Sequence, residues 1–376
     1  MSDTLALVES PAQLLNVLEW AHVHPGGAAS LTIAVLQPVD PRSREQVRRL
    51  CRFASQSKVV WRRYEVRAGY LGRAGELMRL GRAVGAADRL VIGDLFSRTI
   101  QLLLPRSKAR EVVVVDDGTA TTELVGLLTD GQQLTRWHQG EVKASAKGGP
   151  VNRWLAREEL ARTVFFTCMP VTAPPGTEIR PNEYAWSRET FGPVRVRPGA
   201  DLAGSSLVET GVVDEDRYVE AVGWIARSRA AGRYLAHRRE SAAKLARIAG
   251  ATGMEIVHPE LPLELAALTE PIGRSVLTFA STVAYTLPIV LRGAPVRVEL
   301  CEIDDAWITP DTAERSVEFL RRISALAVDR HALTLVPPQP RGPERAGGGP
   351  YAAPHGNPYE ASYGSSEPLP AAQREA

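Results

Sequence analysis

Charged side chains that could act as acid or base stand directly after the most apolar run of the first half of the chain. Asp116 and Asp117 follow Glu111–Val115, and Gly118 permits a sharp turn after them. Adjacent carboxylates cannot share one face of a strand, so one is predicted to cap the next helix and the other to point into a crevice. A carboxylate in a crevice can act as a general base. An ordinary Asx turn and a metal-binding acidic pair are the alternatives.

A second group of side chains has the chemistry of an anion site. His237 ends the β-type run 233–237 and is followed by Arg238 and Arg239. Two neighbouring cations disfavour a protonated imidazole unless an anion such as phosphate is bound. The segment therefore indicates either a phosphate site or a structural histidine.

Two more predicted strand ends carry polar side chains: His258 ends the run 254–258 with Glu264 shortly after it, and Ser281 with Thr282 follows the run 275–280. Glu264 could accept hydrogen bonds from ribose hydroxyls, or could be an ordinary first-turn helix carboxylate. Ser281 and Thr282 precede a predicted helix, where free backbone N–H groups could help to cradle a phosphate, or simply cap it. The chain lacks glycine-rich dinucleotide and Walker motifs, which argues against a dinucleotide enzyme or a P-loop ATPase.

The elements that must position these side chains alternate between β-branched runs and amphipathic stretches. The first strand is predicted at Leu5–Glu9, with Ser10 as the N-cap of a helix and Gln13 closing a capping box. Four consecutive valines in Glu111–Val115 indicate a strand covered on both faces, hence a parallel sheet between helix layers.

A second alternating series has predicted strands at 206–210, 233–237, 254–258, 275–280 and 296–303. This alternation predicts an α/β fold of two doubly wound domains. Ligands in such sheets bind outside the carboxyl ends of the strands, which is why the strand ends are the candidate sites. We place an N-terminal domain at 1–170, an irregular connection at 171–204 and a nucleotide-binding domain at 205–336. Residues 337–376 hold 9 prolines and 6 glycines and are predicted to be disordered.

Composition excludes several classes of protein. The 376-residue chain has 45 Lys+Arg against 43 Asp+Glu, a net charge of +2, so nothing suggests nucleic acid as a partner. Three distant cysteines argue against a disulfide framework or a zinc site. The N-terminus does not resemble a secretion signal, so we expect a cytoplasmic protein, with at most peripheral association at the inner face of the membrane.

The motifs together resemble those of the bacterial sialyltransferases, namely the lipooligosaccharide enzymes of glycosyltransferase family 52 and the capsular polysialyltransferases. Leu7–Asn16 is similar to the family's opening strand, turn and helix, and Asp116–Thr119 to its acidic-acidic-glycine motif. Tyr234–Glu240 is similar to the segment with its His-Pro motif, and Ser281–Thr282 to its paired-hydroxyl motif.

The resemblance implies a GT-B-like fold, with two Rossmann-like domains facing a cleft. It also implies an inverting, metal-independent transfer of a sialic-acid-type sugar from a CMP-activated donor to a glycan, lipid-linked or polysaccharide acceptor, with no cofactor. By position, Asp116 or Asp117 would be the base, and His237, with Arg238 beside it, would contact the phosphate. Glu264 would hold the ribose, and Ser281 with Thr282 would bind the CMP phosphate.

The chain departs from the family pattern at two points. Arg238 takes the place of the proline after His237, and the literal His-Pro pair is at His258, which remains the alternative phosphate ligand. Asp214 resembles an acid that serves as base in family 52 and competes with Asp117. The other functions considered are a transferase with another nucleotide-sugar donor and a catalytically silent nucleotide-binding or scaffolding protein. The oligomeric state is left open.

Overall fold

The computed structural model describes residues 3–24, 26, 30–56, 59–67, 70–134, 150–160 and 162–338. Residues 1–339 form one compact unit. The segment predicted to be disordered, 337–376, lies outside the described residues from 339 onward.

The first sheet has seven parallel strands in the order β3-β2-β1-β4-β5-β6-β7. In chain order they are β1 (Thr4–Val8), β2 (Leu31–Leu36), β3 (Val60–Tyr64), β4 (Arg89–Ile92), β5 (Glu111–Val115), β6 (Arg162–Thr167) and β7 (Thr177–Pro181). The first sheet also holds α1 (Pro11–Val23), α2 (Pro41–Gln56), α3 (Tyr70–Ala86), α4 (Arg98–Leu103), α5 (Ala120–Thr129) and α6 (Pro150–Leu155) between its strands.

The second sheet has six parallel strands in the order β10-β9-β8-β11-β12-β13. They are β8 (Val196–Ala203), β9 (Ala231–Leu235), β10 (Glu255–Val257), β11 (Ile272–Thr278), β12 (Arg297–Cys301) and β13 (Thr334–Val336). The remaining helices are α7 (Ala185–Thr190), α8 (Glu215–Arg229), α9 (Ala242–Thr252), α10 (Leu263–Thr269), α11 (Val283–Val290) and α12 (Glu314–His331).

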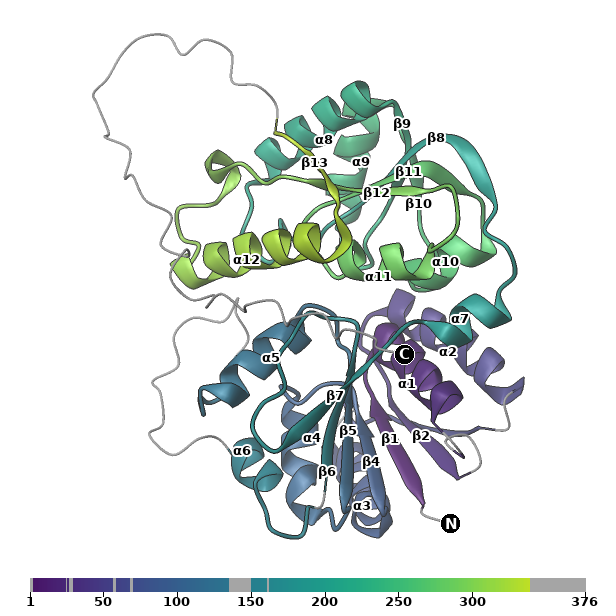
Figure 1. Cartoon of the computed structure of the whole chain (residues 1–376), viewed down its shortest axis with the longest axis vertical. Helices are drawn as coiled ribbons and strands as arrows, with labels where there is room; N and C mark the ends of the chain where they lie inside the picture. The colour runs from purple at the N-terminus through teal and green to yellow at the C-terminus, as the bar shows by residue number, and fades with distance from the viewer. Residues whose placement is uncertain are drawn as a thin grey trace, which may run out of the picture. The chain divides into compact units, whose positions relative to one another are not determined.

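Both sheets follow the same doubly wound order, in which the chain moves outward from a central strand and then returns to its other side (Figure 1). The predicted fold class, a GT-B-like pair of Rossmann-like sheets, is confirmed. The reversal lies between β1 and β4 in the first sheet and between β8 and β11 in the second. Ligands of such sheets bind at the carboxyl ends of the strands that flank the reversal.

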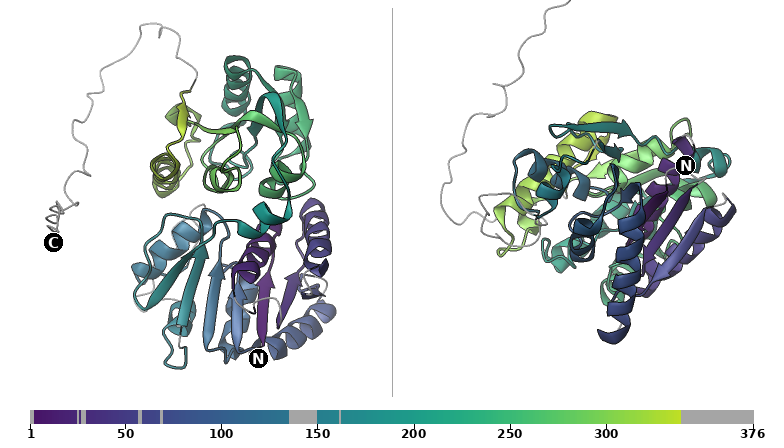
Figure 2. Two further views of the ribbon diagram at one scale, coloured as in Figure 1. Left: turned by 45° about the vertical axis from the view of Figure 1, so that its right-hand side comes forward. Right: turned by 90° about the horizontal axis from the view of Figure 1, so that it is seen from below.

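Strand β5 shows why the sheets are covered on both faces. Val113 and Val115 pack into one core cluster with α1 and α2, and Val112 and Val114 into another with α3, α4 and α5. Successive side chains of a strand point to opposite faces, so a strand of four valines needs a helix layer on each side. The helices lie along the sheets in both further views (Figure 2).

The predicted irregular connection at 171–204 is wrong, because β7, α7 and β8 all lie within it or at its edge. Strand β7 closes the first sheet and ends at Pro181, where an edge position tolerates the missing N–H. Strand β8 is central in the second sheet, which therefore begins nine residues before the predicted boundary at 205.

A β-bulge lets β8 run through Pro198 and Gly199. The pairing moves from Arg197 opposite Gly273 to Ala200 opposite Ser275, so β8 carries one residue more than β11 there. The fully buried Asp201 side chain accepts the Gly273 N–H at 2.6 Å, which satisfies a donor beside the bulge. A proline-glycine pair in sequence suggests a loop, but the bulge accommodates it inside a strand.

The predicted strand at 206–210 is also wrong, since these residues form a turn. The N–H of Thr210 donates to the Ser206 carbonyl at 3.0 Å, and that of Gly211 to the Val208 carbonyl at 2.9 Å. These donors pair locally and are not available to a neighbouring strand.

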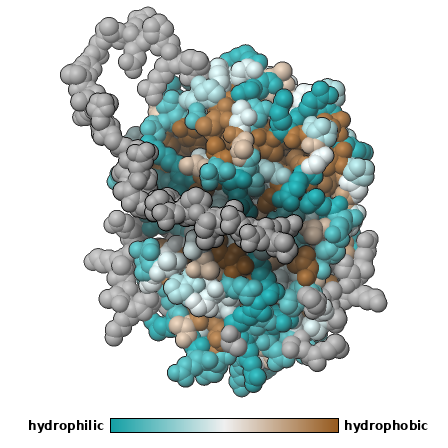
Figure 3. All heavy atoms as spheres, in the orientation of Figure 1, coloured by the Kyte–Doolittle hydropathy of each residue, from teal (hydrophilic) through white to brown (hydrophobic). Residues whose placement is uncertain are grey.

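Surface character varies over the molecule. The view in Figure 3 shows hydrophilic side chains over much of this face and apolar ones gathered in the part that holds the second sheet. No helix among the described residues has the length and the apolar character needed to cross a membrane.

Candidate functional site

The acidic turn after β5 separates its two carboxylates, as predicted, but neither caps α5. Asp116 is 1% exposed, and its Oδ2 accepts the Cys168 N–H at 2.7 Å. Its carbonyl accepts from Asn16 Nδ2 at 2.9 Å. Burial raises the pKa of Asp116 to about 6. Asp116 therefore ties β5 to β6 and α1 and is out of reach of an acceptor, which corrects its candidacy as base.

Asp117 is partly exposed and is held by the first helix. Gln13 Nε2 donates to Asp117 Oδ1 at 3.0 Å, and the Asp117 N–H donates to Thr121 Oγ1 at 3.2 Å. Ser10 Oγ accepts the Gln13 N–H at 3.2 Å, which confirms the predicted N-cap. The capping box differs in one partner: Gln13 Oε1 accepts the N–H of Glu9 at 2.7 Å rather than that of Ser10. Gln13 thus links the carboxyl end of β1 to Asp117.

The acidic turn of the first sheet touches the hydroxyl pair of the second. The Thr119 N–H donates to Thr282 Oγ1 at 3.1 Å. Gly118 has φ of +69°, and a Cβ there would lie 2.0 Å from Thr282 Oγ1. Only glycine fits this left-handed turn and this close approach. Two motifs that are more than 160 residues apart in sequence therefore meet in the structure.

Ser281 and Thr282 lie just before α11, as predicted, at the carboxyl end of β11. Neither hydroxyl caps the helix: Thr282 has no side-chain cap bond, and Ser281 Oγ lies 3.2 Å from Thr278 Oγ1. Because Thr282 Oγ1 accepts from Thr119, its own O–H can be donated to another oxygen. The N–H groups of Ala284, Tyr285 and Thr286 donate to the carbonyls of Ser281 and Thr282, so the donors that this helix start can offer an anion are chiefly the hydroxyls.

His237 follows β9 and is held by its backbone and its ring. Its N–H donates to Glu240 Oε2 at 2.6 Å, and its Nδ1 accepts the Arg239 N–H at 3.3 Å. Burial, then Arg238, Arg239 and Lys244, lower the pKa of His237 to about 3. The ring is thus neutral at pH 7, with its proton on Nε2, since Nδ1 is the acceptor. It can donate a hydrogen bond without being a cation.

The lowered pKa of His237 predicts a contribution to acid instability. Below pH 6.5, the ordinary pKa of histidine, this side chain binds a proton in the unfolded chain. In the folded protein the ring stays neutral down to about pH 3. Stability must therefore fall as pH falls through this window. We expect His237→Asn to make the free energy of unfolding, measured in urea, fall less between pH 7 and pH 4 than in the wild type. The exposed His258, whose pKa is lowered too but less strongly, is the comparison residue, and His258→Asn should change the slope less than His237→Asn does.

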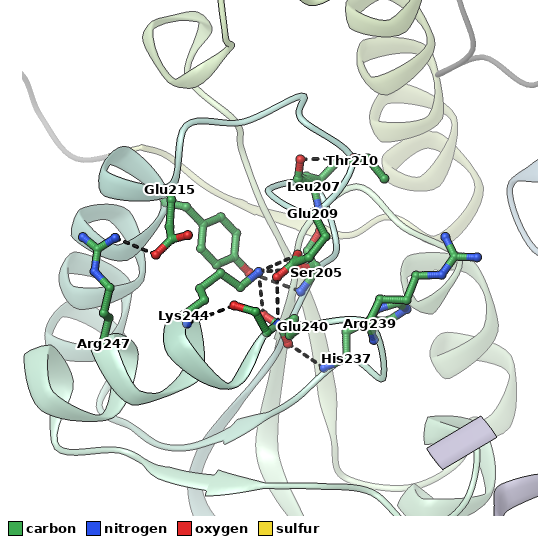
Figure 4. A network of polar contacts seen from close by, with 12 residues as sticks. Ser205, Leu207, Glu209, Thr210, Glu215, His237, Arg239, Glu240, Lys244 and Arg247 are labelled. Carbon is green, nitrogen blue, oxygen red and sulfur yellow. Dashed lines mark hydrogen bonds and ion pairs between the residues drawn. The ribbon is translucent and has the colours of Figure 1, made fainter. Parts of the chain in front are cut away.

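A buried network fixes the segment that carries His237 (Figure 4). Lys244 is 0% exposed, and its Nζ lies 2.9 Å from both Glu240 Oε1 and Glu209 Oε2 and 3.0 Å from the Ser205 carbonyl. Tyr234 donates its hydroxyl to Glu240 Oε1 at 2.6 Å. Glu240 therefore connects a buried ammonium to the His237 backbone.

Arg238 is half-buried and interacts electrostatically with carboxylates of both sheets. Burial, then Arg239, lower its pKa, while Asp117, Asp40 and Glu264 act in the opposite direction. Among the described residues no carboxylate lies within ion-pair distance of its guanidinium. A partly buried cation without a paired anion is costly, so this arrangement suits a negatively charged ligand.

The two other predicted ligands lie in different surroundings. Glu264 is in the first turn of α10, 8% exposed, and its Oε1 accepts from Thr286 Oγ1 at 2.8 Å. The Glu264 carboxylate also interacts electrostatically with Arg238. His258 is exposed after β10, and burial followed by Arg42 lowers its pKa. It lines a pocket together with Arg238 rather than lying beside Thr282.

Asp214, the competing base, is the N-cap of α8. Its Oδ1 accepts the Arg217 N–H at 3.0 Å, and its own N–H donates to the Trp307 carbonyl at 2.8 Å. Asp214 therefore caps a helix, and its hydrogen bonds within the described part of the chain do not reach the acidic turn or His237. It is not brought together with the other candidates.

Metal binding was not predicted, and the described residues include no cluster of three His, Cys, Asp or Glu side chains that could hold an ion. The three cysteines are buried, and no disulfide joins them in the part of the chain that the structure describes. Metal independence itself stays a prediction.

Sequence reasoning missed Lys244, Glu209 and Asn16. Lys244 sits in an amphipathic helix where a lysine normally faces water, so its full burial has no local signal. Asn16 donates to Asp116 and accepts from Asn182 at 2.9 Å, linking segments that are far apart in the chain. The sequence offers one indication, Ser241, which is a clear N-cap signal for α9. Ser241 lies three residues before Lys244 and so fixes the helix that carries it.

Comparison with known protein families and with curated proteins finds no match. Among solved structures, the chain is similar to the α/β-galactoside α-2,3-sialyltransferase of Photobacterium phosphoreum at 10% identity, with TM-score 0.49, over 89% of this chain and 99% of that one.

Two other solved structures are similar over comparable lengths. A putative UDP-N-acetylglucosamine 2-epimerase from Listeria monocytogenes matches at 11% identity and TM-score 0.49, over 88% of this chain and 89% of that one. The E. coli ADP-heptose LPS heptosyltransferase II matches at 12% identity and TM-score 0.37, over 87% of this chain and 99% of that one. Because these names cover two transferases and an epimerase, the similarity does not select a reaction.

Proposed function

We propose that the chain is a nucleotide-sugar-dependent glycosyltransferase that moves a sialic-acid-type sugar from a CMP-activated donor to an acceptor hydroxyl. The observation that carries the proposal is the meeting of Asp117–Thr119 with Ser281–Thr282, with His237 and Arg238 at the carboxyl end of β9, two strands from β11 in the same sheet. A carboxylate opposite a set of anion-binding donors is what an inverting transfer with a phosphate leaving group requires.

Each residue has a task in this reaction. Asp117 accepts the proton of the attacking acceptor hydroxyl, and Gln13 orients its carboxylate. His237 donates from Nε2 to an oxygen of the leaving CMP phosphate. Preorganised donors of this kind stabilise charge as it develops, which is usually the largest catalytic contribution.

The remaining residues bind the phosphate and the ribose of the nucleotide. Ser281 and Thr282 donate their hydroxyls to the phosphate, and Arg238 neutralises its charge. Glu264 accepts from the ribose with the oxygen that Thr286 leaves unused. CMP leaves through one phosphate, so these groups suffice in principle without a divalent cation.

Thermal unfolding with CMP, UDP, CDP and GDP tests the donor class. Ligand at a hundred times its Kd adds about 2.7 kcal/mol to stability, so CMP should raise the Tm clearly and the other nucleotides less. The Arg238→Gln variant should lose most of the CMP shift, and Arg227→Gln, an exposed change on α8, should keep it.

Other outcomes decide among the alternatives. Stabilisation by UDP or another nucleotide but not by CMP would replace the CMP donor by a different nucleotide sugar. Stabilisation by CMP with no release of CMP from any CMP-sugar would point to a catalytically silent nucleotide-binding protein.

A further inference from the structure

We propose that a pocket beside the candidate base binds an anionic group of the acceptor, a carboxylate or a phosphate. The pocket has a volume of about 260 Å³ and lies between α2 and the ends of β9 and β10. The inference rests on the proposed function, because only transfer defines an acceptor. It adds a substrate class and a pocket that shares Arg238 with the proposed donor site.

The pocket is built from both sheets, and its walls are tied together. Gln46 is 9% exposed, and its Nε2 donates to the carbonyls of Pro259 at 2.9 Å and Leu261 at 3.2 Å. Arg49 forms an ion pair with Glu260 on the opposite wall. The shape therefore depends on specific contacts and is not an accidental gap between loops.

Some charged side chains that line the pocket are in ion pairs, and others are not. Its two carboxylates already have cations: Glu260 is paired with Arg49, and Glu45 with Arg48 at 2.6 Å and Arg49 at 3.0 Å. Arg42 and Arg238 also line the pocket. Among the described residues neither has a carboxylate within ion-pair distance, which leaves the pocket with an excess of positive charge.

Two side chains that line the pocket have lowered pKa values. The pKa of His258 is lowered by burial and by Arg42, and that of Arg238 by burial and by Arg239. A bound anion would relieve both effects, because it offsets the repulsion and compensates the partly buried cation.

The position and volume of the pocket favour an acceptor group over the donor as its ligand. Arg238, which lines the pocket, interacts electrostatically with Asp117, and this links the pocket to the residue proposed to deprotonate the acceptor. The donor phosphate has its own donors in His237, Ser281 and Thr282. Whole ligands usually occupy ~300–1,000 Å³, so this pocket suits one charged group and part of its sugar ring.

Calorimetric titration with small acids tests the pocket. The probes are methyl α-N-acetylneuraminide, its neutral methyl ester and sn-glycerol 3-phosphate, each titrated with and without saturating CMP. We expect at least one of the two acids to bind about 10- to 100-fold more tightly than the ester, the range for a hydrogen bond to a charged group. Arg42→Glu should remove this preference and leave CMP binding intact. Arg42→Gln should remove part of it.

Arg52→Glu is the matched control, because this exposed arginine lies on the same helix and does not line the pocket. Preference for the sialoside over the phosphate identifies a carboxylate-bearing acceptor, and the reverse identifies a phosphate-bearing one. Equal binding of acid and ester, or equal losses in Arg42→Glu and Arg52→Glu, overturns the inference while CMP binding leaves the proposed function standing. An acid-selective pocket in a chain that binds no nucleotide overturns the acceptor assignment together with the proposed function.

Discussion

Asp117→Asn is expected to lower the initial rate of CMP release from CMP-sialic acid by about 10²–10⁴-fold, the range typical for loss of a general base. The substitution keeps the size of the side chain and an oxygen that can accept from Gln13, which now donates at 3.0 Å. CMP affinity should therefore stay close to the wild-type value. The measurement is CMP release at saturating donor, beside a CMP binding titration.

Two aspartates provide matched controls for Asp117. Asp214→Asn should retain activity, because asparagine caps helices as well as aspartate does. Asp116→Asn should also retain activity, since the amide carbonyl oxygen can accept the Cys168 N–H that Asp116 Oδ2 accepts. Full activity of Asp117→Asn with loss in Asp214→Asn would move the base to α8 and contradict the site described above.

Lys244→Met should lower the free energy of unfolding by about 3–5 kcal/mol, because it leaves the buried Glu240 without its cation. Glu240 also accepts from the His237 backbone, so the same change should weaken CMP binding. Urea unfolding and a CMP titration measure the two effects. Arg247→Met, on the same helix but in exposed ion pairs, should cost at most about 1 kcal/mol and leave CMP binding unchanged.

A second variant separates the buried charge from the packing of the lysine. Glu240→Gln removes the charge but can still accept from Tyr234 and from the His237 N–H. Lys244→Met combined with Glu240→Gln should therefore recover part of the lost stability, since contacting residues couple by about 0.5–3 kcal/mol. No recovery in the double variant would mean that the ammonium acts only through its packing and its contact with Glu209.

The sequence predicted the local elements well where the signal is local. The four valines of β5, the Ser10 N-cap and the helix starting after Ser281 each follow from a short stretch of residues, and each is present in the structure. The same holds for the separation of Asp116 from Asp117, because alternation along a strand needs no tertiary information.

Two failures share a different cause. Pro198 and Gly199 suggested a loop, but an unpaired bulge opposite β11 keeps them in a central strand. The alternating residues at 206–210 suggested a strand, but their backbone donors pair within a turn. In both cases the partner of the backbone decided the outcome, and a partner strand is not visible in a local pattern.

By itself the sequence determined that two parallel α/β sheets form and that polar side chains stand at their strand ends, because apolar periodicity and caps act over a few residues. Only the tertiary structure decided which of those side chains meet. The close approach of Gly118 to Thr282 and the burial of Lys244 both depend on how distant segments pack. Burial and long-range contact set the charge state and reach of each group, and neither is encoded within one segment.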